Sequence, residues 1–178
     1  GYDISSNPGS LDPQYASDRE SYLIIGSVFE GLFRIGADGN AEKAMAESYT
    51  VSDDGLTYNF KLKQDRYWTD VNGYSKKVTA ADFVFGFRRL FLPETRAPKA
   101  SEYFCIKNSD KINSGEITDL SQLGVTAQGD YSLTIELQYT EPSFAMLLAM
   151  PAAMPCNEEY FIKAQGKYGL DAERTPSN

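Results

Sequence analysis

Apolar and polar side chains alternate with a period of two in residues 57–63 and again in residues 132–137. The apolar positions of these two stretches are Tyr58, Phe60, Leu62, Leu133, Ile135 and Leu137. Because successive side chains of a β-strand point to opposite faces, this alternation predicts two strands, each with one apolar and one polar face. We expect the two strands to pair within one sheet.

The residues before the first of these strands predict a β-hairpin. The Asp-Asp-Gly sequence at 53–55 favours a tight turn, since aspartate tolerates the left-handed region and glycine has no Cβ. Tyr49 and Val51 alternate with polar neighbours before that turn. A slip of one residue would expose the apolar face, so the turn fixes the register. Trp68 follows the hairpin and is expected to close the core at the end of the sheet, with its N–H hydrogen-bonded.

Other stretches follow the spacing of an α-helix. Residues 19–31 carry an apolar stripe, and Ser17 and Asp18 supply N-cap oxygens just before it. The sequence TAAD at 79–82 resembles a capping box and predicts the start of a helix that Pro93 ends. Further helical segments are expected at residues 42–48, 143–150 and 158–165.

These elements alternate irregularly and include hairpins. This order predicts an α+β layer, in which helices pack against a mixed or antiparallel sheet. The chain has 178 residues, 42% of them hydrophobic, which suffices for the core of one or two domains. The formal net charge of -8 argues against nucleic acid as a partner. No run of residues approaches the length and apolarity of a membrane span.

The chain contains no histidine and only two cysteines. The lack of histidine excludes a Ser-His-Asp triad, a His-paired cysteine nucleophile and an ordinary histidine zinc site within this chain. Cys105 and Cys156 form no C-x-x-C pair, so a zinc cluster is not expected. They are either two buried free thiols or a disulfide, which would stabilise the fold by ~4 kcal/mol in the chain-entropy model.

Carboxylates are plentiful, with 25 aspartates and glutamates. Asp53 and Asp54 suggest calcium, but the chain has no Asp-x-Asp-x-Asp-Gly loop with a distal glutamate. Two of these carboxylates could also be interpreted as the catalytic pair of a hydrolase. Nothing in their sequence context points to a raised pKa, and we expect no metal or other cofactor.

Several motifs, in this order along the chain, resemble family 5 extracellular solute-binding proteins, the peptide and nickel receptors of ABC importers. The motifs are SLDPQ at 10–14, FEGLFR at 29–34, AMAESYTVSDDGLTYNFKLK at 44–63, YWTD at 67–70, VTAADFVFGFRRL at 78–90, APKAS at 97–101, YSLTIEL at 131–137 and EPSFAMLLAMP at 141–151. One departure is the turn within VNGYSKKVTAADF at 71–83, which is longer than the family's and is expected to enlarge only a surface loop.

The resemblance implies an α/β fold of the type II periplasmic-binding-protein kind, with two lobes that close on a ligand around a hinge. It implies that residues 1–30 begin lobe one, residues 31–155 form a small accessory domain of that lobe, and residues 156–178 return into it. Lobe two is expected to lie outside this chain, which looks truncated. Family members are exported to the periplasm, or are lipid-anchored at the extracellular face of the cytoplasmic membrane in Gram-positive bacteria.

The resemblance also implies ligand-binding positions. In peptide-binding members, the residues a few positions after the Asp-Pro pair run beside the ligand as extended backbone, and here they are Ser17, Asp18 and Arg19. Lys99 follows the proline of APKAS, where peptide binders often carry tyrosine, and Met150 ends the apolar segment before Pro151. Backbone hydrogen bonding suits a receptor that accepts varied side chains, and Arg19 would also grip a carboxylate.

Each of these residues has a structural alternative. Ser17 and Asp18 would merely cap a helix, Arg19 would be solvated, Lys99 would be an exposed loop lysine, and Met150 would belong to the core.

The expected function is that of a substrate-binding component of an ABC importer, which delivers oligopeptides or dipeptides to a membrane permease without catalysis. Alternatives are a receptor of the same family for nickel, an oligosaccharide or another small solute, a hydrolase with paired carboxylates, and a structural or adhesive surface domain.

Overall fold

A computed structural model describes residues 9–170 and 176–178. In these residues the α-helices are α1 (Arg19–Val28), α2 (Ala80–Phe91), α3 (Ser109–Asn113), α4 (Phe144–Leu147) and α5 (Glu158–Lys163). Short 3-10 helices are η1 (Pro93–Thr95), η2 (Ala100–Tyr103), η3 (Leu120–Gln122) and η4 (Pro151–Ala153). The strands are β1 (Phe33–Ile35), β2 (Ala41–Lys43), β3 (Ala46–Val51), β4 (Thr57–Leu62), β5 (Tyr67–Thr69), β6 (Ser75–Lys77), β7 (Val125–Ala127) and β8 (Ser132–Glu136).

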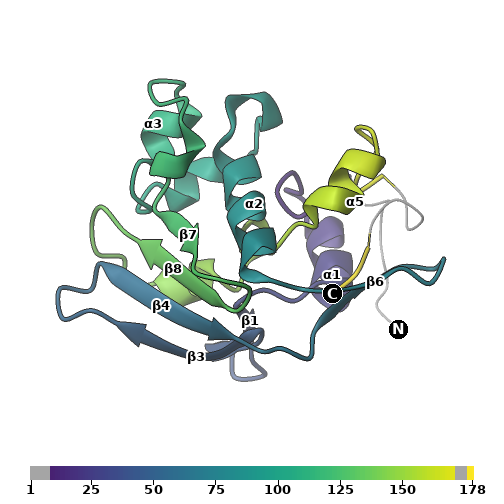
Figure 1. Cartoon of the computed structure of the whole chain (residues 1–178), viewed down its shortest axis with the longest axis horizontal. Helices are drawn as coiled ribbons and strands as arrows, with labels where there is room; N and C mark the ends of the chain where they lie inside the picture. Colours follow the sequence, from purple (N-terminus) through teal and green to yellow (C-terminus); the bar gives the residue numbers. More distant parts are fainter. Residues whose placement is uncertain (1–8, 171–175) are drawn as a thin grey trace.

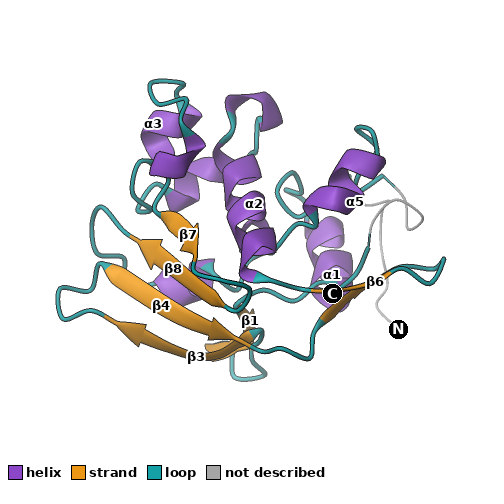
Figure 2. Cartoon of the chain, in the orientation of Figure 1, coloured by secondary structure: helices purple, strands orange, loops and turns teal. Residues whose placement is uncertain are grey.

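The main sheet has four strands in the order β3-β4-β8-β7, and each of its pairs is antiparallel. β4 pairs with β8, with Phe60 opposite Leu133 and Tyr58 opposite Ile135, which confirms the pairing predicted from the alternating stretches. Figure 2 shows α2 and α3 above this sheet in that view, with α2 at the centre of the molecule and α1 and α5 to its right. The fold is thus α+β, as predicted.

Two predicted helix starts are confirmed. The Asp18 side chain accepts a hydrogen bond from Ser21 N at 2.8 Å and caps α1. Thr79 and Asp82 form the capping box of α2. However, α1 ends at Val28, three residues before the predicted end at 31. The chain leaves the helix at the C-cap Phe29, whose backbone is extended with φ -119° and ψ 149°.

The helix predicted at residues 42–48 is wrong. Residues 41–43 form β2, which pairs with β1, and residues 46–51 form β3. Met45, which lies between the two strands, is completely buried, and Ala46 at the start of β3 is almost completely buried. The helix-forming residues of this stretch take the strand conformation because both neighbouring strands supply backbone partners, and such tertiary pairing overrides propensity. The segment predicted helical at 143–150 is helical only over Phe144–Leu147.

Trp68 lies in β5 and is fully buried, and its ring system forms a T-shaped pair with Phe29 at 6.2 Å between centroids. Its predicted hydrogen bond is not formed. Among the described residues, no acceptor meets hydrogen-bond geometry at the indole N–H, although the indole is near enough to Asp82 to lower the pKa of that carboxyl, which burial raises more strongly. Trp68 thus stabilises the core mainly through its apolar area.

Both cysteines are buried free thiols, so the disulfide alternative is not realised. Cys105 belongs to the main hydrophobic cluster, whereas Cys156 belongs to a second, smaller cluster with Tyr160 and Tyr168. The two thiols therefore pack in different parts of the core. Of the two alternatives, that of buried free thiols is confirmed, and each cysteine behaves as a small apolar residue.

The long turn between β5 and β6 is fastened to α5, on the right of Figure 1. Tyr160 donates from its hydroxyl to Asp70 at 2.9 Å, and Asn157 donates to the Tyr74 hydroxyl at 3.0 Å. The tip of this turn is exposed to solvent, and its Val71 is 71% exposed. The added residues therefore contact the fold as well as lengthening a surface loop. No helix within residues 9–170 and 176–178 combines the length and the apolarity that crossing a membrane requires.

Candidate functional site

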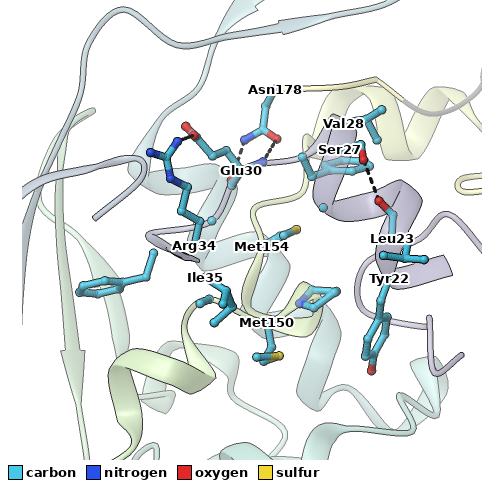
Figure 3. Close-up of a pocket in the computed structure, with 16 residues that line it drawn as sticks. Tyr22, Leu23, Ser27, Val28, Glu30, Arg34, Ile35, Met150, Met154 and Asn178 are labelled. Carbon is cyan, nitrogen blue, oxygen red and sulfur yellow. Dashed lines mark hydrogen bonds and ion pairs between the residues drawn. The ribbon is translucent and has the colours of Figure 1, made fainter. Parts of the chain in front are cut away.

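The candidate site is a groove of about 540 Å³ between the C-terminal half of α1, residues 28–35 and residues 149–154. Figure 3 shows these three segments surrounding it. Its lining residues are Tyr22, Leu23, Gly26, Ser27, Val28, Phe29, Glu30, Gly31, Phe33, Arg34, Ile35, Ala149, Met150, Pro151, Met154 and Asn178. The groove joins segments that are far apart in sequence, so it exists only in the folded chain.

The walls of the groove are mainly apolar. Val28 and Ile35 remain 38% and 42% exposed although they are large and hydrophobic. Met150, which is half-buried, and Met154, which is buried, also line the groove. Exposed apolar groups of this kind lose contact with water when a ligand covers them, which favours the binding of apolar parts of a ligand.

One rim of the groove is polar and internally paired. Asn178 donates to Glu30 O at 3.0 Å, and Glu30 N donates to Asn178 Oδ1 at 2.9 Å. The Glu30 carboxylate lies 3.7 Å from Arg34 and 3.4 Å from Arg66. These contacts hold residues 28–35 against the end of the described chain (Figure 3). The rim therefore fixes the shape of the groove, and each charge in it already has a partner.

The other end of the groove is marked by Tyr22, a half-buried residue of α1. Burial raises the pKa of its hydroxyl, and the nearby positive charge of Lys99 works in the opposite direction. Lys99 itself donates to Glu102 at 2.6 Å, and this hydrogen bond raises the pKa of the Lys99 ammonium. An aromatic ring with a hydroxyl group and an ion pair thus meet near this end.

The structure places the five predicted site residues in different surroundings. Of the five, Met150 alone lines the groove. Ser17 and Arg19 are exposed. Asp18 binds Ser21 through N at 2.8 Å and through Oγ at 2.6 Å, and these hydrogen bonds lower the pKa of its carboxyl. The capping alternative therefore accounts for the Asp18 side chain.

Sequence reasoning missed Tyr22 and Asn178 as lining residues. Tyr22 lies within the apolar stripe predicted for residues 19–31, which by itself indicates packing against the core. The signal that could have identified it is its hydroxyl, because a tyrosine in such a stripe is typical of a boundary between apolar and polar surroundings. Asn178 is far from Glu30 in the sequence, and no local pattern indicates that contact. Across the described residues, no three His, Cys, Asp or Glu side chains gather where they would hold a metal ion.

The chain belongs to the bacterial extracellular solute-binding proteins of family 5, whose model matches residues 40–176. The dipeptide-binding protein of Lactococcus lactis is 35% identical over 99% of this chain and 31% of its own length. The oligopeptide-binding protein OppA of Bacillus subtilis is 36% identical over 88% of this chain and 28% of its own length.

Solved structures agree with these relatives. The substrate-binding domain of an oligopeptide ABC transporter from Bacillus anthracis matches with a TM-score of 0.89 and 40% identity, covering 95% of this chain and 32% of that one. Listeria monocytogenes OppA bound to peptide matches with a TM-score of 0.93 and 31% identity, covering 98% of this chain and 34% of that one. The fold is that of periplasmic binding proteins of the OppA type. The chain spans about a third of the length of the relatives it matches.

Proposed function

We propose that this chain forms one wall of the ligand cleft in the substrate-binding component of an ABC importer. The receptor captures oligopeptides or dipeptides outside the cytoplasmic membrane and delivers them to a permease. The family, and relatives named as dipeptide- and oligopeptide-binding proteins, support this proposal. The family's description as extracellular supports a place in the periplasm or on a membrane anchor at the outer face.

The observation that carries the proposal is the apolar groove beside α1. In this groove Val28 and Ile35 are exposed to solvent. Removing their apolar surface from water would be energetically favourable. The groove is open on one side, whereas small-ligand sites bury most of the ligand surface. A second wall is therefore needed before a ligand is enclosed. We propose that residues 1–30 and 156–178 belong to lobe one, that residues 31–155 are its accessory domain, and that a second lobe closes over the groove.

The five candidate residues take distinct roles in this proposal. Met150 supplies a flexible, polarizable wall that adapts to different side chains. The exposed backbone of Ser17 pairs with an extended peptide, while Asp18 remains the N-cap of α1. The exposed Arg19 side chain, on the first residue of α1, binds a ligand carboxylate. Lys99 sets charge preference at one end, because a ligand carboxylate there would compete with Glu102 for its ammonium.

The receptor binds without catalysis in this proposal. The charged groups around the groove are Glu30, Arg34 and Lys99, and each forms an ion pair with a neighbouring side chain. Such pairs hold a shape and favour complementary ligands, whereas a general acid or base would need a free group with a pKa near neutrality.

Calorimetry of the full-length receptor with a library of two- to five-residue peptides tests the function. We expect binding to several peptides and none to an oligosaccharide or to nickel ions. Heat with a sugar or nickel, and none with any peptide, would contradict the peptide assignment. Turnover of a peptide or glycoside that is abolished by one Asp or Glu substitution would contradict the proposed absence of catalysis.

A second candidate ligand is an amphipathic steroid acid. The protein named as a probable deoxycholate-binding periplasmic protein of Escherichia coli is 34% identical over 91% of this chain. The apolar walls of the groove and the Lys99 charge near Tyr22 suit a rigid apolar body with one carboxylate. Deoxycholate in the same calorimetric series distinguishes the two ligand classes, since tight steroid binding without peptide binding would favour this candidate.

A further inference from the structure

Arg89 is a buried cation on α2 that lies outside the groove. It is 6% exposed. Its guanidinium binds both oxygens of the Asp12 carboxylate, with Nη2 2.5 Å from Oδ2 and Nη1 3.1 Å from Oδ1. Nη1 also donates to Gln14 Oε1 at 2.8 Å. Asp12 is 7% exposed and Gln14 is fully buried. We call Asp12, Gln14 and Arg89 the Arg89 cluster.

The guanidinium of Arg89 is enclosed on its remaining sides. Its Cζ lies 4.1 Å from the ring centroid of Phe161 and 5.4 Å from that of Tyr168. Nη1 is also 3.3 Å from Cys156 Sγ. A planar, delocalised cation suits this combination of a two-point carboxylate contact and stacked rings, and a lysine ammonium does not reproduce it.

Gln14 connects this buried cation to the wall of the groove. Its Nε2 donates to Met154 O at 2.8 Å and approaches Ala152 O at 3.5 Å. The orientation of the amide is dictated by chemistry, since arginine only donates and the two carbonyls only accept. Met154 lines the groove, and Pro151 and Met150 precede it in the same wall.

Asp12 connects the same cation to the start of α1. Its backbone oxygen accepts from Tyr15 N at 3.0 Å and from Ala16 N at 2.9 Å, and its Oδ1 accepts from Gln14 N at 3.1 Å. This turn leads directly into residues 17–19 and α1. The segment that precedes α1 and the wall opposite α1 are thus held by one guanidinium.

We propose that Arg89 is a positioning residue of the groove, which sets the spacing between α1 and the Met150–Met154 wall through Asp12 and Gln14. The consequence for ligands rests on the function proposed above. The consequence for the groove's geometry does not, and it is measurable on the 178-residue chain.

Two variants and one control test this proposal. Arg89→Lys keeps the charge but loses the two-point contact and the ring stacking. Gln14→Leu keeps the Asp12–Arg89 pair and removes the amide that joins Arg89 Nη1 to Met154 O and Ala152 O. Arg88→Lys makes the same chemical change one residue earlier in α2, where the arginine is half-buried and, among the described residues, its Nε has no hydrogen-bond partner.

The readout is the methyl NMR spectrum of the methionines in each folded variant. We expect the Met150 and Met154 methyl resonances to shift in Arg89→Lys and in Gln14→Leu, while the resonance of Met45, which is buried in the main core, stays in place. Arg88→Lys should leave all of them unchanged. In the full-length receptor, both cluster variants should weaken peptide binding by about tenfold, and the control should not.

A purely structural role gives a different result. The folded molecules would then keep wild-type Met150 and Met154 resonances, and only a separate set of unfolded signals would grow. That outcome, in either cluster variant, overturns the proposal. Absence of peptide binding by the wild-type receptor would refute the proposed function, while the methyl spectra would still decide the role of Arg89.

Discussion

Gly86 lies in the middle of α2, where the helix backbone touches the wall of the groove. A Cβ on this residue would stand 2.7 Å from Met154 O and 3.4 Å from Cys156 N. Both atoms belong to backbone, which moves less easily than the end of a side chain. The shortfall against the 3.0 Å that real Cβ atoms keep is about 0.3 Å, so Gly86→Ala must push α2 away from residues 154–156.

Two opposing effects decide the size of the change. Alanine is favoured over glycine in a helix by ~1 kcal/mol. Overpacking of a well-packed core costs about 1–3 kcal/mol. The close contact is with backbone, so we expect overpacking to win and Gly86→Ala to lower the free energy of unfolding by ~1 kcal/mol. For a chain of this size that corresponds to a fall in Tm of about 2–4 °C.

Gly26→Ala is the matched control. Gly26 lies in the last turn of α1, and no heavy atom of the described residues comes within 4 Å of its Cβ position, beyond its own chain neighbours and helix backbone. Here only the propensity gain remains, and because Gly26 lies in the last turn of the helix we expect a rise in stability of about 0.5–1 kcal/mol. Urea unfolding followed by circular dichroism measures both changes. A Gly86→Ala variant as stable as the wild type would refute the close contact between α2 and Met154, and a less stable Gly26→Ala variant would refute the open space at α1.

Three further expectations follow from the burial and contacts of single residues. Burial raises the pKa of the Cys105 thiol to about 11 and that of Cys156 to about 12, so both should react slowly with a thiol reagent in the native chain at pH 8 and completely in denaturant; a count below two thiols in denaturant would contradict the free cysteines. Asp18→Ala should lower stability at pH 7 by ~1 kcal/mol and Asp18→Asn by much less, since asparagine still caps the helix. Hydrogen bonds from Ser21 lower the pKa of the Asp18 carboxyl below its ordinary value of 3.8. The charge-dependent part of the cap is therefore present above that pH and is lost as the pH falls through the folded-state pKa. Equal unfolding curves for the Ala variant and wild type would contradict the cap. Met150→Ala should change stability little, because the side chain is half-buried, but should weaken peptide binding by the full-length receptor; an unchanged affinity in calorimetry would remove Met150 from the site.

The local sequence pattern correctly predicted those elements that have one apolar and one polar face. The pairing of β4 with β8 follows from alternation, because a period of two leaves one register that buries both apolar faces. The capping box of α2 follows from spacing alone. Residues 42–48 were predicted wrongly, because Glu, Ala and Met favour a helix when isolated and only β1 and β4 make strands of them.

The candidate site was less accessible to sequence reasoning. The resemblance identified Met150, which lines the groove, but four of the five predicted residues lie outside it. Arg89 reads as one of two adjacent arginines in an apolar helix, and only the fold shows that it faces Asp12 and its neighbour does not. Such contacts depend on which turn of the helix faces inward and on segments that meet from opposite ends of the chain.

Trp68 is the one tryptophan of the chain, and the Phe29 ring lies between it and the groove. A ligand that presses on Phe29 therefore changes the immediate surroundings of the indole without touching it. The 178-residue chain thus carries a built-in optical probe, whose emission should register the filling of the groove with no added label.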